Sequence, residues 1–260
     1  MLTAVKSIPS LGIRPVTAVT SLDDDVFVMR KDSKAVEVYQ YEAGTFKFEF
    51  KRHVKVPELR KCSEGIAACG HHKCLYISEA GEDSVHRADL SGSNEVTKWS
   101  VAPEPKHLSL AREPKGLSVN DVHNVVVACY KARKIQEHTT HGILVKEICL
   151  KAVMTRPWHS VQLSTGYYAV SQNTSPGAVV VVNGDGQELL RYNGDKGVLG
   201  YPTSLAVRKI ITRESKIDVI HVADSANDRI LSMKIKKNSP SYDHHHEGNF
   251  CRMPGLTFNC

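Results

Sequence analysis

The stretch His221-Val222-Ala223-Asp224-Ser225-Ala226-Asn227-Asp228-Arg229-Ile230-Leu231 decides the fold of this chain, because parts of it recur elsewhere in the sequence. Residues 127–136, Val-Ala-Cys-Tyr-Lys-Ala-Arg-Lys-Ile-Gln, repeat its register and place Ala128 on Ala223 and Ile135 on Ile230. Looser copies lie at residues 75–85 and 26–33. A recurring unit of this kind indicates a fold built from repeats.

A second landmark precedes the copies, a Pro or Ser followed by small and apolar residues. It starts at residues 15, 63, 114, 157, 202 and 254, so successive starts are 43 to 52 residues apart. Periods of this length, made of short apolar strands, are typical of a β-propeller with one four-stranded blade per repeat. We therefore predict an all-β propeller of the six-bladed type that occupies residues 1–260 as a single domain.

The two ends of the chain are expected to share the last blade. Five blades are complete, and the sixth is partial, with residues 2–8 as its outer strand and Pro254 to Asn259 as its innermost strand. This pairing would protect edges that otherwise invite aggregation. A fragment of a longer gene product remains an alternative explanation.

Each unit is predicted to contain four strands. In the third, Leu117-Ser118-Val119 is the innermost strand, residues 125–128 and 134–137 follow it, and residues 143–148 form the outer strand. Gly142 lies in the turn before the outer strand, where glycine supplies the positive φ that tight turns require.

The units resemble two known families of repeats. Val222-Ala223-Asp224-Ser225-x-Asn227-x-Arg229-Ile230 resembles the core of an NHL repeat, and residues 185–207 resemble the junction between two such repeats. Residues 75–94 of the second blade are similar to a YWTD repeat. Both resemblances imply six-bladed propellers.

The two resemblances imply different functions. The NHL resemblance implies a tripartite-motif-like recognition module that binds protein or single-stranded RNA on an end face of the propeller. Any ubiquitin-ligase activity would need a RING domain, which this chain lacks. The YWTD resemblance implies an extracellular ligand-binding propeller, which is the alternative.

Composition agrees with a folded, water-exposed domain. Hydrophobic residues make up 41% of the chain and charged residues 24%, and the formal net charge is +6. No run reaches the roughly 18 to 20 apolar residues that span a bilayer. The first residues lack the pattern of a signal peptide. We expect a cytoplasmic location and no membrane association.

Catalytic signatures are absent. The sequence has no phosphate loop, no Gly-x-Ser-x-Gly elbow and no His-Glu-x-x-His helix. Calcium-dependent lactonases of the propeller type, a weaker alternative, need several acidic and amide side chains at inner-strand ends. Here Glu64 and Asn120 alone lie at such ends. We expect no enzymatic activity and no cofactor.

Two clusters raise the question of a metal site. Cys62 and Cys69-Gly70-His71-His72-Lys73-Cys74 lack the paired Cys-x2-4-Cys spacing of structural zinc, so free thiols on a hairpin are favoured, and a Cys69–Cys74 disulfide stays open. Residues 244–246, His-His-His, alternate in direction and favour a solvated loop. We predict no metal.

Charge gives the remaining functional indication. A basic sector is expected on the end face that carries the turns between second and third strands, where it would bind an anionic partner such as RNA. An evenly charged surface is the alternative. The residues of this predicted basic sector are Arg30, Lys31, Lys34, Lys131, Arg133, Lys134 and Arg156.

Three residues of the fifth unit have a structural explanation. Asp224 and Asn227 lie between two strands, where their side chains are suited to hydrogen-bond the amides of the turn. Arg229 begins the next strand and can satisfy the same loop. We therefore predict a structural repeat motif rather than a ligand contact.

Overall fold

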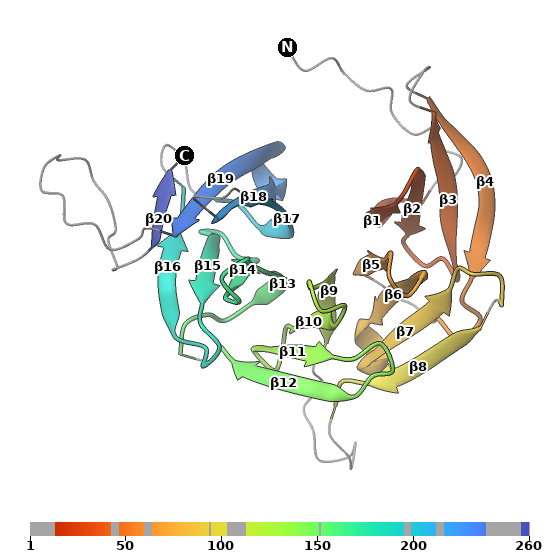
Figure 1. The fold of residues 1–260 in the computed structure, drawn as a ribbon, viewed down its shortest axis with the longest axis horizontal. Coiled ribbons are helices and arrows are strands. Elements are labelled where there is room, and N and C mark those ends of the chain that lie inside the picture. The colour runs from red at the N-terminus through yellow and green to blue at the C-terminus, as the bar shows by residue number, and fades with distance from the viewer. Residues whose placement is uncertain are drawn as a thin grey trace, which may run out of the picture. The chain divides into compact units, whose positions relative to one another are not determined.

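The computed structural model describes residues 14–42, 47–59, 64–93, 95–102, 113–150, 152–194, 199–211, 216–237 and 256–259. Within these residues the chain forms five sheets of four antiparallel strands, and each sheet uses strands that follow one another in sequence (Figure 1). Helix is confined there to the 3₁₀ turns Ala80–Glu82 and Ser225–Asn227. The all-β fold and the five complete blades predicted from the repeats are confirmed.

The first two blades follow the predicted order of strands. The first contains β1 Val16–Leu22, β2 Asp25–Arg30, β3 Ala35–Glu42 and β4 Lys47–Lys55. The second contains β5 Ile66–Cys69, β6 Cys74–Glu79, β7 Ser84–Asp89 and β8 Val96–Ser100.

The remaining blades repeat this arrangement. The third contains β9 Pro114–Val119, β10 Val125–Cys129, β11 Lys134–His138 and β12 Leu144–Cys149. The fourth contains β13 Pro157–Gln162, β14 Tyr168–Gln172, β15 Ala178–Val182 and β16 Glu188–Tyr192. The fifth contains β17 Pro202–Ile211, β18 Lys216–Asp224, β19 Arg229–Lys237 and β20 Leu256–Asn259.

Burial follows the strands in the middle of each sheet. Strands β10 and β15 are runs of small and β-branched residues, and every one of their side chains is buried. Continuous apolar runs of this kind suit strands that are covered on both faces. Outer strands differ, since β12 has one buried residue, Ile148. The packed interior of each blade therefore lies at its second and third strands.

The backbone divides into two compact units. The first holds the first two blades, strand β9 and residues 137–145, and the second holds residues 126–136, residues 146–149 of β12, and the fourth and fifth blades. Each unit has its own apolar core. Phe27, Leu75 and Ile77 belong to the core of the first unit, and Val181, Ile220 and Met233 to the core of the second. The assignment of all residues to one domain stays a prediction.

The predicted partial sixth blade is wrong at its C-terminal strand. Leu256–Asn259 pairs antiparallel with β19, with Lys237 opposite Leu256 and Lys234 opposite Asn259, so it is the outer strand of the fifth blade. Residues 238–255 separate the two strands, whereas the third and fourth strands of the fourth blade are joined through residues 183–187. This long interval hid the pairing from a repeat-based analysis. The predicted outer strand at residues 2–8 lies outside the described residues.

Gly142 packs a turn against an outer strand, and its substitution tests this contact. Its φ is +81°, and a Cβ added there would overlap the indole of Trp99 on β8. Gly166 has φ +80° but nothing within 4 Å of such a Cβ, so it is a matched control for backbone strain alone. We expect Gly142→Ala to lower the free energy of unfolding by about 3 kcal/mol and Gly166→Ala by about 1 kcal/mol. Urea denaturation of both variants measures this difference, and equal losses would contradict the packing argument.

Candidate functional site

Two residues of the predicted basic sector are engaged inside their own blades. Arg30 is buried, its Nε donates to both carboxylate oxygens of Glu37 at 2.9 Å, and its Nη1 donates to the carbonyl oxygen of Arg14 at 3.0 Å. Lys134 forms an ion pair with Glu147 on the neighbouring outer strand. Both charges are thus neutralised by a partner within the same blade.

The other five members of the sector are exposed. Lys31 and Lys34 share the turn of the first blade, and Lys131 and Arg133 share the turn of the third, while Arg156 precedes β13. The structure therefore groups these cations in pairs on single turns. Binding of an anionic partner by them stays a prediction.

Asp224 is the centre of a buried polar contact in the fifth blade. Its side chain is fully buried and accepts hydrogen bonds from the amide of Gly200 at 2.7 Å, from Asn227 Nδ2 at 2.8 Å and from Arg229 Nε at 2.7 Å. Burial alone would raise the pKa of this carboxyl, but the hydrogen bonds from Asn227 and Arg229 outweigh it and lower the pKa. The motif holds the turn together.

In the first three blades a contact from the same strand end recurs at a fixed spacing. The last residue of the second strand reaches the residue seven positions later, on the third strand, in the pairs Arg30–Glu37, Glu79–His86 and Cys129–Gln136. The residue types differ from blade to blade, so similarity of sequence does not reveal the contact. A comparison of residues seven positions apart would have revealed the contact. Its presence gives Arg30 a structural role in the turn of the first blade.

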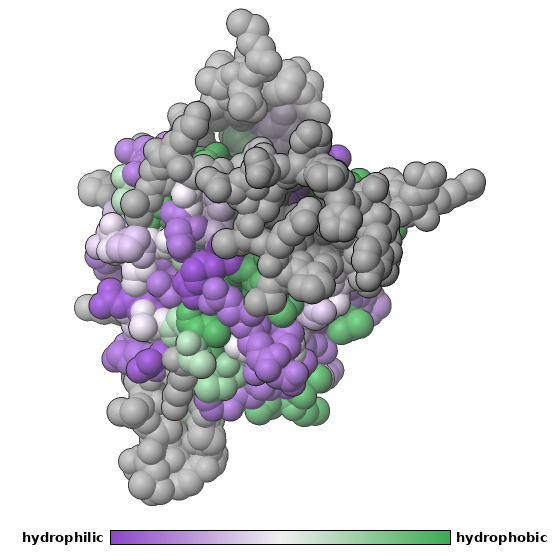
Figure 2. Space-filling view, turned by 90° about the vertical axis from the view of Figure 1, so that its left-hand side faces the viewer, coloured by the Kyte–Doolittle hydropathy of each residue, from purple (hydrophilic) through white to green (hydrophobic). Residues whose placement is uncertain are grey.

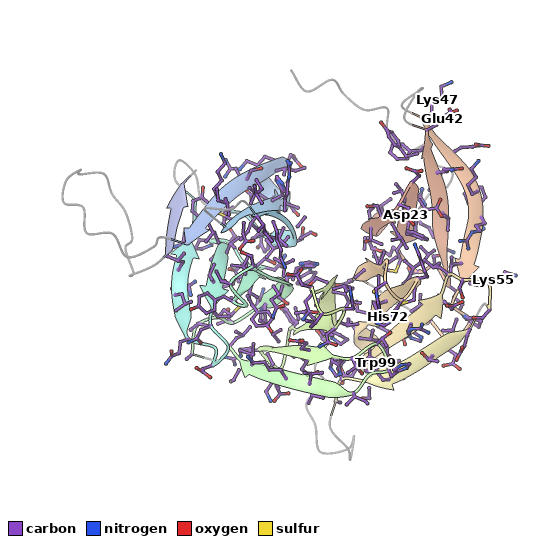
Figure 3. All side chains as sticks on the ribbon, viewed as in Figure 1. Asp23, Glu42, Lys47, Lys55, His72 and Trp99 are labelled. Carbon is purple, nitrogen blue, oxygen red and sulfur yellow. The ribbon has the colours of Figure 1, made fainter. Side chains whose placement is uncertain are left out.

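Loops of the second and third blades bring imidazole rings together in the first unit. His71 and His72 lie in the loop between β5 and β6, and His123 lies in the loop between β9 and β10. The rings of His71 and His123 stack with centroids 4.1 Å apart and an interplanar angle of 1°, and His72 meets His71 edge to face at 4.7 Å. Figure 3 shows His72 beside β6.

We call the loops 70–73, 120–124 and 139–143 the histidine surface. All three loops join strands at the same end of their blades, because each connects a first to a second or a third to a fourth strand. Val122 and Ile143 are each 67% exposed on it. Sequence analysis noted His71 and His72 but missed the surface, because the contact joins loops some 50 residues apart.

Hydrogen bonds fix the loops of the third blade. Glu137 Oε1 accepts from Asn120 Nδ2 at 2.9 Å and from Asn124 Nδ2 at 2.7 Å, and Asn120 Oδ1 accepts the amide of Asn124. The loop that contains His123 is therefore held at both ends. The loop 139–143 rests on Trp99, as Figure 3 and the close approach of Gly142 to the indole show.

The surroundings of His72 disfavour a positive charge on its ring. Burial lowers the pKa of His72, and the neighbouring His71, His123, Arg87 and His141 lower it further because a second positive charge beside them is unfavourable. At the edge of the surface Lys73 Nζ lies 3.1 Å from Asp23 Oδ2, which balances its charge.

The rings are not arranged as a metal centre. Stacked parallel rings direct their nitrogens side by side rather than toward one point, and in the described part of the chain no group of three or more His, Cys, Asp or Glu is placed to hold a metal ion. Cys69 and Cys74 are buried free thiols. Cys62 and residues 244–246 lie outside the described residues.

The inner-strand ends considered for calcium are occupied by protein contacts. Glu64 Oε2 lies 2.7 Å from Lys115 Nζ, and Asn120 is used in the turn of the third blade. Neither side chain is left to form a cage of hard oxygen ligands.

On the side on which β16 lies, both hydrophilic and hydrophobic side chains are exposed among the described residues (Figure 2). Among the described residues no helix is long and apolar enough to cross a membrane.

Comparisons with known proteins give the fold. No protein-family model and no curated protein matches the chain. The nidogen/laminin complex is similar with a TM-score of 0.58 and 12% identity, over 88% of this chain and 82% of that one. Virginiamycin B lyase from Staphylococcus aureus is similar with a TM-score of 0.58 and 10% identity, over 86% and 71%.

A third similar structure is hydrazine synthase from Kuenenia stuttgartiensis. It has a TM-score of 0.51 and 15% identity, over 83% of this chain, which spans 60% of the hydrazine synthase chain, less than two thirds of its length. These likenesses, with the sheet order, give the chain a β-propeller fold.

Removal of the Asp224 carboxylate tests the structural motif. The change Asp224→Ala leaves the amide of Gly200 and the guanidinium of Arg229 without their acceptor, so we expect a loss of about 3 kcal/mol in the free energy of unfolding. Asp89 also accepts several hydrogen bonds, from Ser91 and Ser93, but on the surface. We expect Asp89→Ala to lower the free energy of unfolding by less than Asp224→Ala. Denaturant titration measures both, and a larger loss for Asp89→Ala would contradict the assignment.

The lowered pKa of His72 predicts a dependence of stability on pH. Its ordinary value is 6.5, so the unfolded chain takes up a proton near that pH while the folded chain does so at a lower pH. The stability that neutral His72 contributes is present above pH 6.5 and is lost as the pH falls through the folded-state pKa. We expect His72→Asn to reduce the loss of stability between pH 7.5 and 5.

Exposed His53 on β4 supplies the control for this measurement. His53→Asn should keep the pH dependence of the wild type, as measured by chemical denaturation at each pH. If both variants behave alike, the loss at low pH arises elsewhere.

Proposed function

We propose that this chain is a non-catalytic recognition module that binds a protein through the histidine surface. The observation that carries the proposal is the exposure of Val122 and Ile143, each 67% exposed, beside the imidazoles of three neighbouring loops. Aliphatic and imidazole groups with little net charge suit the centre of a protein interface, where charged residues are depleted.

Rigidity of the surface supports the same function. The hydrogen bonds of Glu137 to Asn120 and Asn124, and the packing of Gly142 on Trp99, hold two of the loops in place. A preorganised surface loses little conformational entropy on binding, so more of the contact energy is retained as affinity. The nidogen/laminin complex is a similar structure solved with a protein partner, which agrees with this use of the fold.

The proposal includes the absence of catalysis and of a cofactor. Glu64 is paired with Lys115, and Asn120 is committed to its turn, so the side chains considered for calcium have other partners. Because streptogramin B lyase and virginiamycin B lyase are among the similar folds, an assay for lyase activity on a streptogramin is the direct test of this part. Turnover would contradict the non-catalytic assignment.

An NHL-type module that binds single-stranded RNA is the second candidate. The exposed pairs Lys31 with Lys34 and Lys131 with Arg133 favour it. Arg30 and Lys134 are engaged with carboxylates. Phosphate contacts by the other five predicted cations would give a slope of log K against log salt of about −3.5. The basic turns and the histidine surface consist of different residues, so mutation of each can distinguish the two candidates.

Affinity capture with quantitative mass spectrometry tests the protein-binding function. The double variant Val122→Asp with Ile143→Asp should lose at least tenfold of any specifically captured protein, because two buried charges without partners cost several kcal/mol. Ile211→Asp is the matched control, since Ile211 is 66% exposed on β17 and belongs to none of the three loops. Equal capture by the two variants would contradict the assignment of the surface.

Fluorescence anisotropy with a labelled single-stranded RNA tests the second candidate. The variant Lys131→Glu with Arg133→Glu should abolish binding if the cations of that turn hold phosphates, and the wild type should show the steep salt dependence given above. Tight binding that is lost in this variant and kept in the Val122→Asp, Ile143→Asp variant would favour RNA over protein.

A further inference from the structure

We propose that Cys69 and Cys74 are a redox-active pair that forms a reversible disulfide across the β5–β6 hairpin. The two residues lie directly opposite each other in the antiparallel pair, at its last position before the loop 70–73. Both are free and buried, with 2% and 0% of their surface exposed. The proposal concerns a modification site and does not depend on the proposed recognition function.

The backbone register gives the separation of the two cysteines. The amide of Ser78 donates to the carbonyl oxygen of Gly65 at 2.9 Å, so Gly65 and Ser78 form a hydrogen-bonded pair. Pair types alternate along an antiparallel ladder, which makes Cys69 and Cys74 a hydrogen-bonded pair with Cα atoms about 5.5 Å apart. This separation lies inside the range of disulfides, roughly 4.4 to 6.8 Å.

The same geometry makes the bond reversible rather than permanent. Side chains of hydrogen-bonded pairs stand farther apart than those of the other pair type, so closing the bond strains the ladder. Strained disulfides are more easily reduced than relaxed ones and are those that respond to the redox state of their surroundings. We therefore expect the bond to form and open with the thiol–disulfide ratio of the medium.

Access for an oxidant comes from the end of the hairpin. Gly70, His71 and Lys73 are exposed, so fraying of the loop uncovers Cys69 and Cys74 before any other residue of the two strands. The thiol of Cys69 accepts the amide of His72 at 3.5 Å. Burial raises the pKa of Cys74 and so disfavours the thiolate of that residue. Cys69 is thus the first nucleophile and Cys74 the second.

The oxidant is a low-molecular-weight disulfide, for which oxidised glutathione is the probe. The Cys69 thiolate attacks one of its sulfurs, and one glutathione leaves as a thiolate that takes up the proton lost by Cys69. Cys74 then loses its proton to solvent buffer and attacks the sulfur of Cys69, which releases the second glutathione. Two thiols and one disulfide become one protein disulfide and two glutathione thiols, with two electrons passed to glutathione.

The bond would act on the loop that carries His71 and His72. It would close a ring around Gly70, His71, His72 and Lys73 and would change the surroundings of Tyr76 and Arg87, which interact with the Cys74 thiol. The hydroxyl of Tyr76 in turn lies 2.7 Å from that of Thr140, which belongs to the loop 139–143. The redox state of the pair is therefore linked to two loops of one surface.

Mass spectrometry of the folded protein tests the pair. The reduced chain is equilibrated in buffers with increasing oxidised glutathione, quenched in acid, alkylated and digested with trypsin. Cleavage after Lys73 places Cys69 in peptide 62–73 and Cys74 in peptide 74–87, so the bond appears as a linked pair of peptides. Cys62 shares the first peptide, so Cys62→Ser is the matched control and should keep the link, whereas Cys69→Ser should lose it.

Exposed Cys149 reports that the oxidant works, because it should become glutathionylated in every variant. We expect the linked peptides to dominate in oxidised glutathione and to vanish in excess reduced glutathione, with an unchanged far-ultraviolet circular dichroism spectrum. Three outcomes would each overturn the proposal. They are modified Cys149 without linked peptides, a link in Cys69→Ser, and a link that forms only in denaturant.

Discussion

The second and fifth blades depend on how they satisfy the buried carboxylate at the end of their second strand. A buried carboxylate such as Asp224 or Glu79 would cost several kcal/mol without partners, so the chain must fold its turn back to supply them. In the fifth blade the donors are Gly200, Asn227 and Arg229, and in the second they are Ser84, His86 and Lys98. This requirement orients the third strand and ties the fourth strand of the second blade to the same carboxylate.

Polar contacts inside a blade also explain why two residues predicted to bind a partner have structural roles. From the sequence alone, Arg30 and Lys134 were predicted to be available to a partner, because the sequence does not show which carboxylates lie opposite them in the sheet. In the folded chain each faces a glutamate on an adjacent strand of its own sheet, Glu37 and Glu147. The charges left exposed are those in the turns themselves, whose side chains have no opposing strand.

Local patterns predicted the blades well because their strands are joined by short connections. Pro114, Pro157 and Pro202, chosen as landmarks, are the first residues of β9, β13 and β17. The histidine surface was not predictable in the same way, because stacking of His71 on His123 requires the packing of two blades rather than a pattern within one. The outer strand of the fifth blade was missed for a related reason, since pairing at long range leaves no periodic signal.

The outer strand of the fifth blade also bears on the order in which the chain folds. Strands β19 and β20 are separated by residues 238–255, and closing an interval of 18 residues instead of five costs about 1 kcal/mol more in chain entropy. The fourth blade is complete once residue 192 has left the ribosome, but the fifth must wait for residue 259. Until then β19 has a bare edge that offers unpaired amides to any other strand. A newly made chain is therefore most exposed to mispairing at its fifth blade, during the synthesis of residues 238–255.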